Sequence, residues 1–176
     1  SIVHRDISAE NILLTRGAHH GPLQVRLIDF GMSTGHRYSK GSDRGKPSYQ
    51  APELHSGDMF DGFLADAFGV GVVLYIALLR EYPWLSTAPG ACKSFGFCRT
   101  RGLRVLLERR SLAKRRANPE AAAAPRLSEP LFRLLEGLMA VNPAKRLTLG
   151  ECAWFEVGGN RSVWEEPWVQ GVSHLA

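Results

Sequence analysis

Three short strings near the start of the sequence hold the side chains best suited to chemistry. The first is HRDISAEN at residues 4–11, which runs into an apolar stretch, and the second is DFG at residues 29–31, which follows another. The third is APE at residues 51–53, preceded closely by GKPSY. Acids and amides beside apolar strands can orient a hydroxyl group and bind a hard cation such as Mg²⁺ through oxygen. Phosphoryl transfer needs both functions, because a carboxylate must lie beside the attacking hydroxyl while cations neutralise the phosphate oxygens.

In order and spacing, these strings resemble the HRDxxxxN, DFG and APE motifs of eukaryotic protein kinases. Further strings extend the resemblance over residues 2–155: DAFGVGV, PW and NPAKRLT, which begin at positions 66, 83 and 142, resemble the family's DVWSxGV, PF and DPxxRxT. The resemblance implies a mainly α fold, that of the larger, helical lobe of a kinase (the C-lobe), with two short hairpin strands around the catalytic loop. We expect residues 1–155 to form this partial kinase domain and residues 156–176 to form a C-terminal tail.

The resemblance implies a role for each matching residue of the active site. Asp6 matches the catalytic base that orients the substrate hydroxyl, and Asn11 and Asp29 match the ligands of Mg²⁺. Leu13 matches the floor under the adenine ring of ATP, and Asp66 matches the aspartate that braces the catalytic loop. ATP and Mg²⁺ are therefore the expected cofactors, and a protein is the expected substrate.

Two pairs of residues match positions that hold the family's helical lobe together. Glu53 and Arg146 correspond to the glutamate of APE and the arginine of DPxxRxT, which form an ion pair in the family. His4 and Phe30 correspond to two members of a stack that packs only in the active state. We expect both contacts in this chain.

The loop between the DFG and APE strings is the expected regulatory segment. Arg5, directly before the catalytic aspartate, is typical of kinases switched on by loop phosphorylation, because its guanidinium needs an anion that a phosphate supplies. The resemblance puts the phosphorylation site at Ser42, with Ser39 and Tyr38 as alternatives and a merely solvated serine as the competing interpretation. The loop lacks the Pro-x-x-Trp that tyrosine kinases carry before APE, which predicts transfer to serine or threonine.

One departure from the family lies in the catalytic loop. Serine/threonine kinases carry a lysine two residues after the catalytic aspartate and a threonine in GTxxY, and here these positions are Ser8 and Lys46. The arginine of tyrosine kinases is replaced by Glu10, which also matches an acid that binds a substrate arginine. We expect a swap, in which Lys46 reaches to within about 4 Å of the Asp6 carboxylate and acts as a catalytic cation. The competing interpretation is a solvated lysine in a degraded enzyme.

The sequence has no string that resembles the glycine-rich loop, the VAIK lysine or the lysine's glutamate partner. In the family these form the smaller lobe (the N-lobe), so we expect that lobe upstream in the parent chain and expect the 176 residues alone to be inactive. A second hypothesis is a non-catalytic kinase-like module that docks partners through its basic segment. The retained Asp6, Asn11 and Asp29 favour the enzyme, because a scaffold needs none of them.

The composition is that of a folded chain. Hydrophobic residues make up 44% and charged residues 22% of the 176 residues, which excludes a disordered chain. Three cysteines are too few for a disulfide scaffold, and the odd number predicts a reducing, intracellular location, the cytoplasm with the nucleus as the alternative. No uninterrupted apolar run reaches 18 residues, so we expect no membrane span.

The net charge of +5 comes from one segment. Between Arg99 and Arg116 lie eight cations and one anion, which leaves a small negative charge on the rest of the chain. No aromatic residue separates these cations, so a nucleic-acid partner is not expected. The remaining interpretations are a solvated helix face, with Leu103, Leu106 and Leu107 turned inward, a nuclear address and a surface that docks an acidic partner.

The elements that must position these motifs follow from hydrophobic periodicity. Apolar residues 12–14 and 25–28 predict two strands, and the apolar run 63–79 predicts a helix buried in the core. Further expectations are a long polar loop at 31–47, a mobile insert at 117–125, an amphipathic helix from Ser128 to the Asn142-Pro143 stop, and a helix starting at Thr148.

Overall fold

The computed structural model describes residues 1–16, 21–41, 44–117, 127–150 and 159–170. As expected, this part of the chain is mainly helical, and it contains two small antiparallel sheets where one hairpin was expected. The helices are α1 (Gly62–Leu79), α2 (Lys93–Arg101), α3 (Leu103–Ala117), α4 (Glu129–Leu138) and α6 (Pro167–Gln170). The strands are β1 (Ile12–Arg16), β2 (Leu23–Leu27), β3 (Tyr38–Lys40) and β4 (Met59–Asp61), with short 3₁₀ turns that include Ala9–Asn11 and Phe30–Met32.

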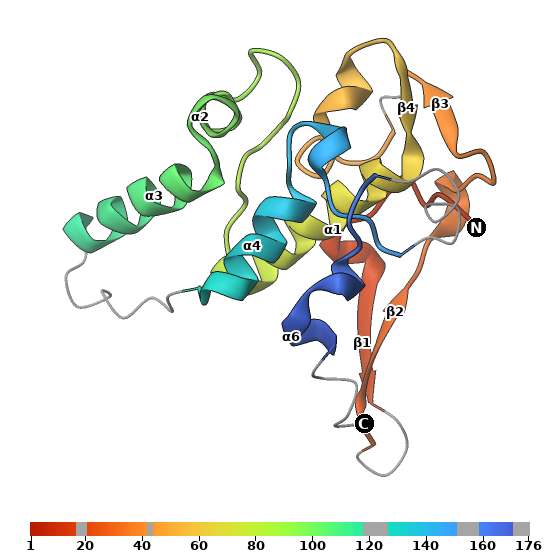
Figure 1. Cartoon of the computed structure of the whole chain (residues 1–176), viewed down its shortest axis with the longest axis horizontal. Helices are drawn as coiled ribbons and strands as arrows, with labels where there is room; N and C mark the ends of the chain where they lie inside the picture. The colour runs from red at the N-terminus through yellow and green to blue at the C-terminus, as the bar shows by residue number, and fades with distance from the viewer. Residues whose placement is uncertain (17–20, 42–43, 118–126, 151–158, 171–176) are drawn as a thin grey trace.

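Helix α1 runs through the middle of the body, with α4 beside it (Figure 1). Its composition is apolar on all sides, and Phe68, Val72 and Tyr75 are fully buried. Gly71 permits the close approach of α4, because a Cβ there would lie 2.7 Å from the Cγ atom of Met139. In the part of the chain that is described, α1 is also the one helix long and apolar enough to cross a membrane, and half of that span is buried in the body, which is typical of a core helix.

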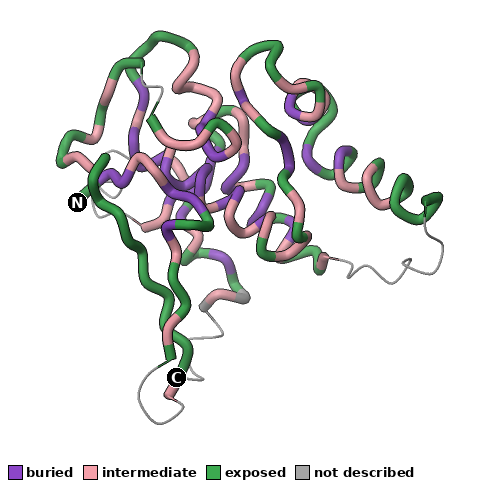
Figure 2. The backbone as a smooth tube through the Cα atoms, turned by 180° about the vertical axis from the view of Figure 1, so that it is seen from behind, coloured by how far each residue is buried: buried purple, intermediate pink, exposed green. Residues whose placement is uncertain are grey.

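A second part of the core joins α1 to α2 and α3. Trp84 is buried against Phe95 of α2, with ring centroids 5.0 Å apart. Leu103 and Leu106 of α3 are buried in the same cluster, and Leu107 is partly buried against it, which confirms the expected inward face. The opposite side of α3 is exposed along its length (Figure 2).

The sequence predicted one of the two sheets and missed the other. β1 and β2 form the expected hairpin, with Ile12 opposite Leu27. The predicted polar loop at 31–47, however, contains β3, whose Tyr38 pairs with Asp61 of β4. This strand depends on a partner 20 or so residues away in the sequence, so local polarity gave no sign of it.

The helix predicted from Ser128 is α4, but it ends at Leu138 rather than beside Asn142. The carbonyl of Gly137 accepts a hydrogen bond from the Leu147 amide at 3.0 Å, and this contact draws the following chain across the helix end. Ser128 occupies the N-cap position, although its side chain makes no capping hydrogen bond. The expected insert and the helix predicted to start at Thr148 fall largely on residues 118–126 and 151–158, outside the described residues.

Candidate active site

The loop at residues 4–11, which is the expected catalytic loop, is attached to α1 by the buried carboxylate of Asp66. Asp66 accepts hydrogen bonds from the backbone amides of His4 at 2.6 Å and Arg5 at 2.9 Å. Arg5 has φ = 66°, a left-handed conformation that is costly for a side chain of this size, and the two hydrogen bonds hold it there. Gly69, one turn further along α1, leaves room for Ile7, which would lie 3.0 Å from a Cβ at that position. The contact between Asp66 and the loop is the one that the sequence predicts.

The two oxygens of the Asp6 carboxylate have different surroundings. The Asn11 side-chain amide donates to Asp6 Oδ2 at 3.0 Å and to the Asp6 carbonyl at 2.8 Å. Asp6 Oδ1 is buried and has no hydrogen-bond partner among the described residues. The backbone of Gly45 closes over it, because a Cβ there would lie 3.4 Å from Oδ1. One oxygen is therefore fixed by Asn11, and the other is a buried acceptor that no hydrogen bond in the described chain uses.

Asn11 and Asp29 lie at the same end of the hairpin, as a shared metal site requires. Asn11 directly precedes β1, and its carbonyl accepts a hydrogen bond from the Ile28 amide at 2.9 Å, which brings the residue before Asp29 against it. Asp29 has φ = 61° and uses Oδ1 to accept from the Gly31 amide at 3.2 Å. The Asn11 carboxamide oxygen and the second Asp29 oxygen have no hydrogen-bond partner within the described chain.

This donor set fits Mg²⁺, a hard cation that uses few protein oxygens and completes its shell with water and phosphate oxygens. A larger group of His, Cys, Asp or Glu that could hold a metal by itself is not found among the residues described. The site thus suits a cation that arrives together with a phosphate ligand.

The expected stack under the hairpin is present. The His4 and Phe30 rings meet edge to face, with centroids 4.9 Å apart, and His4 Nε2 lies 3.0 Å from the Ile28 carbonyl oxygen. His4 is buried, whereas Phe30 is half exposed. Leu13, the expected floor beneath adenine, lies on β1 and is 44% exposed, so its side chain is accessible to a ligand.

Lys46 is close to the catalytic loop, but it does not reach Asp6. Its amine donates to the Ser8 hydroxyl at 3.0 Å and pairs with Glu10 Oε2 at 3.1 Å. Among the described residues, no ion pair joins it to Asp6 within 4.0 Å. The expected Lys46–Asp6 contact is therefore wrong, because the amine is held by the Glu10 carboxylate and the Ser8 hydroxyl instead.

Glu10 has a different partner from the substrate arginine that the sequence suggested. Hydrogen bonds from its own backbone and from Lys46 lower the pKa of the Glu10 carboxyl, so it stays charged beside the amine. The Tyr49 hydroxyl lies 3.5 Å from Glu10 Oε2 and 3.4 Å from the Tyr82 hydroxyl. Burial, together with the hydrogen bond to Tyr82, raises the pKa of Tyr49 well above its usual value. The opposite charges of Glu10 and Lys46 were the signal in the sequence that could have indicated this pair.

The guanidinium of Arg5 contacts the start of the regulatory segment. Arg5 Nε donates to the Met32 carbonyl at 2.5 Å, and Nη2 lies 3.5 Å from the Ser33 carbonyl oxygen. Ser42 is outside the described residues. Of the alternatives, Ser39 is partly buried in β3, and Tyr38 is 52% exposed beneath the guanidinium of Arg37.

The pair expected at the base of the lobe is present. Arg146 donates to both oxygens of Glu53, at 2.5 and 2.9 Å. Its guanidinium also donates to the carbonyls of Leu64 at 2.8 Å and Ala140 at 2.9 Å, and it is fully buried over the ring of Phe68. The arginine is thus a junction between the APE segment, α1 and the chain after α4.

Comparisons with known proteins agree with this geometry. The family model for the protein kinase domain matches residues 1–157. The chain is 35% identical over 159 residues to the serine/threonine-protein kinase SRK2C of Arabidopsis thaliana, covering 88% of this chain and 41% of that protein. It is 33% identical over 171 residues to the serine/threonine-protein kinase SAPK5 of Oryza sativa subsp. japonica, covering 94% of this chain and 41% of that protein. The chain thus spans about two fifths of the length of these relatives.

Proposed function

The chain belongs to the protein kinase domain family, and we propose that it is the C-lobe of a kinase that transfers the γ-phosphoryl group of ATP to serine or threonine of a protein substrate. The observation that carries this proposal is the Asp6 carboxylate. One of its oxygens is fixed by Asn11, and the other is buried without a partner in the described chain, on a loop braced by Asp66. A carboxylate prepared in this way suits a catalytic base.

Each residue of the site has its own role in the proposed reaction. Asp6 Oδ1 accepts the proton of the substrate hydroxyl once substrate binding has displaced the Gly45 backbone that covers this oxygen, while Asn11 keeps the carboxylate from rotating. Asn11 and Asp29 would hold Mg²⁺ through the oxygens that the described chain leaves free. The cation supplies charge neutralisation of the phosphate oxygens when it is bound with ATP. Leu13 offers an exposed apolar surface for the adenine ring.

Lys46 supplies the cation for the transferred phosphoryl group in this proposal. The amine rests on Ser8, the position at which the related kinases carry a lysine, and Glu10 holds it there. A lysine side chain has enough rotatable bonds to swing from Ser8 toward a phosphate when one is bound. An electrostatic stabiliser of this kind contributes about 10²-fold or more to kcat.

A swap-back experiment tests the role of Lys46 in the full natural chain that contains residues 1–176. We expect Lys46→Thr alone to lower kcat by about 10²-fold, because the cation is lost. The double variant Ser8→Lys/Lys46→Thr places the lysine where the related kinases have it and should recover most of that loss. Near-normal turnover of Lys46→Thr would exclude the role.

We propose that the N-lobe of the kinase covers the β1–β2 hairpin. Apolar residues of the hairpin and of the turn that follows it are exposed, which is uncommon for a surface without a partner. They are Leu13, Leu14, Leu23, Val25, Ile28 and Phe30. Without a lobe over this surface, ATP has no residues above it, so the 176-residue chain alone should show no measurable phosphotransfer.

Regulation and location follow the same proposal. Phosphorylation of the segment before APE, at Ser42, would supply the anion for Arg5, which now contacts only backbone oxygens among the described residues. The protein would act inside the cell, in the cytoplasm or the nucleus, where cysteines are kept reduced.

A further inference from the structure

The cations of α3 that face the body are explained by packing. Arg104 pairs with Glu129 at the start of α4 at 2.8 Å. Arg110 and Lys114 both pair with Glu81, just after α1, at 3.4 and 2.8 Å. Arg110 also donates to the hydroxyl of Tyr75 at 2.9 Å. These contacts fix α3 against the body and give each of its three body-facing cations an ion pair there.

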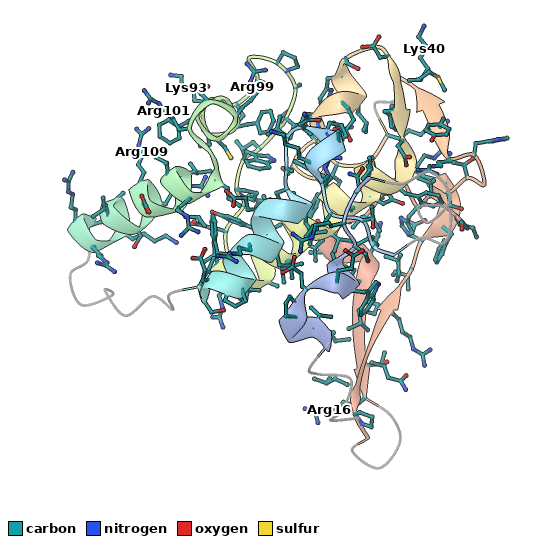
Figure 3. The ribbon with its side chains drawn as sticks, in the orientation of Figure 1. Arg16, Lys40, Lys93, Arg99, Arg101 and Arg109 are labelled. Carbon is teal, nitrogen blue, oxygen red and sulfur yellow. The ribbon has the colours of Figure 1, made fainter. Side chains whose placement is uncertain are left out.

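A second set of cations on α2 and α3 has no ion pair within the described chain. Figure 3 shows four of them gathered around α2 and the adjoining part of α3, away from the body and far from Arg16 and Lys40. The set comprises Lys93, Arg99 and Arg101 of α2 and Arg109, Arg115 and Arg116 of α3, all of them exposed.

A groove of about 380 Å³ lies beside these cations. Its apolar lining includes Phe97 of α2 and Val105 and Leu112 of α3, of which the last two are 41% and 55% exposed. Arg109 and Arg116 line the same groove, and the guanidinium of Arg109 lies 4.9 Å from the centre of the Phe97 ring. We call this surface, with these five residues, the basic groove.

Apolar and cationic side chains alternate along the basic groove because of helical spacing. Val105, Arg109, Leu112 and Arg116 follow one another at i, i+4, i+7 and i+11, so all four lie on one face of α3. The face opposite to it carries Leu103, which is buried in the core, and Leu107, which packs against the core. The outer face is therefore a second amphipathic surface, with exposed apolar side chains between arginines.

We propose that the basic groove binds an acidic amphipathic segment of a partner protein, in which carboxylates pair with Arg109 and Arg116 and apolar side chains enter between them. Charge complementarity supports this occupant, because the cations at the groove have no ion pair among the described residues. The groove shape supports it as well, since a flat lipid surface would leave the recess unfilled. The proposal is independent of phosphoryl transfer.

The binding of a designed peptide to the 176-residue chain tests the proposal. The probe is a fluorescein-labelled peptide of about 15 residues with Glu and Leu at helical spacing, and the control peptides replace either every Leu by Ser or every Glu by Lys. We expect the fluorescence anisotropy to rise on binding for the Glu/Leu peptide and to stay unchanged for both control peptides. Arg109→Glu/Arg116→Glu should weaken that binding by roughly tenfold or more, and Leu112→Ser should weaken it by a smaller factor.

The matched control is Arg16→Glu/Lys40→Glu, which changes the net charge by the same amount at two exposed cations remote from the basic groove. We expect this variant to bind the peptide within about twofold of the unchanged protein. Equal weakening by both double variants, or no binding of the Glu/Leu peptide, would overturn the proposal. So would tighter binding of phosphatidylserine vesicles or of duplex DNA through the same arginines. Circular dichroism of each variant establishes that the helices are retained.

Discussion

The asymmetry of one carboxylate is the most informative feature at the scale of single residues. A side chain kept only for solubility would expose both oxygens to water, whereas Asp6 has one oxygen bound by Asn11 and one buried without a partner in the described chain. A buried acceptor of this kind is costly unless a ligand uses it. In our proposal, the hydroxyl of the substrate becomes the partner of Asp6 Oδ1, which explains why the described chain leaves this oxygen without one.

The Arg146–Glu53 pair predicts a large loss of stability on substitution. Arg146→Met leaves Glu53 charged and mostly buried, with a side-chain exposure of 12%, so the free energy of unfolding should fall by about 3–5 kcal/mol. The control is Arg133→Met, because Arg133 is 70% exposed in its pair with Glu129 and should cost less than about 1 kcal/mol. Urea denaturation of both variants measures the difference. Equal, small losses in the free energy of unfolding would show that the buried pair contributes no more to stability than the exposed one.

The two described cysteines should react with iodoacetamide at different rates. Burial raises the pKa of Cys98 to about 11, so only about one thiol in 10³ is ionised at pH 8. At Cys92, partial burial raises the pKa, but hydrogen bonds from backbone groups, those of Leu85 and Phe95 among them, outweigh it and lower the pKa overall. Because the thiolate is the reactive form, Cys92 should be alkylated first at pH 8, with Cys98 catching up as the pH rises toward its pKa.

Mass spectrometry of tryptic peptides separates these sites, and full denaturation in guanidinium provides the control, since both thiols should then react at similar rates. Faster labelling of Cys98 in the folded chain would contradict the burial of α2 against the core.

The attachment of the catalytic loop to α1 is a property of elements, and it predicts a local change. Asp66→Asn leaves one carboxamide oxygen where two carboxylate oxygens accepted the His4 and Arg5 amides. One buried amide then loses its partner, which costs about 1–3 kcal/mol. Hydrogen exchange at residues 4–6 should accelerate, while exchange within α4 should stay slow. Unchanged protection of the loop would show that Asp66 does not hold it.

The elements also show which structure could be predicted from sequence and which could not. The hairpin and the apolar helix α1 follow from local patterns, because each is specified by neighbouring residues. β3 could not be foreseen, since its partner β4 is contributed by a distant segment. The early end of α4 likewise depends on the Leu147 amide, which reaches the helix only after the chain has turned.

The candidate site was predictable to the extent that motifs specify it. The resemblance of the motifs to the kinase family was sufficient to predict that Glu53 contacts Arg146 and that Asp66 contacts the loop at residues 4–11. The position of Lys46 was not predictable in this way, because two carboxylates compete for one amine and the choice between Asp6 and Glu10 depends on a few ångströms. Distances of that order are set by packing rather than by residue type.

At the scale of the whole molecule, the body is well packed around α1 and exposes apolar side chains on the β1–β2 hairpin. The core around α1 buries large aromatic and aliphatic side chains, whereas the β1–β2 hairpin exposes its apolar residues (Figure 2). The Mg²⁺ ligands that we propose lie at the base of this exposed hairpin. A covering lobe would therefore both bury the apolar surface and close the nucleotide site.

The most direct test of the account measures phosphate transfer from Mg-ATP to a serine/threonine peptide library by the full natural chain that contains residues 1–176, beside its Asp6→Asn variant. The account predicts phosphoserine and phosphothreonine products, with turnover lowered by about 10²-fold or more in Asp6→Asn, the range expected for loss of a general base. Absence of transfer by the unchanged protein, transfer to tyrosine alone, or equal turnover by Asp6→Asn would contradict the central claim.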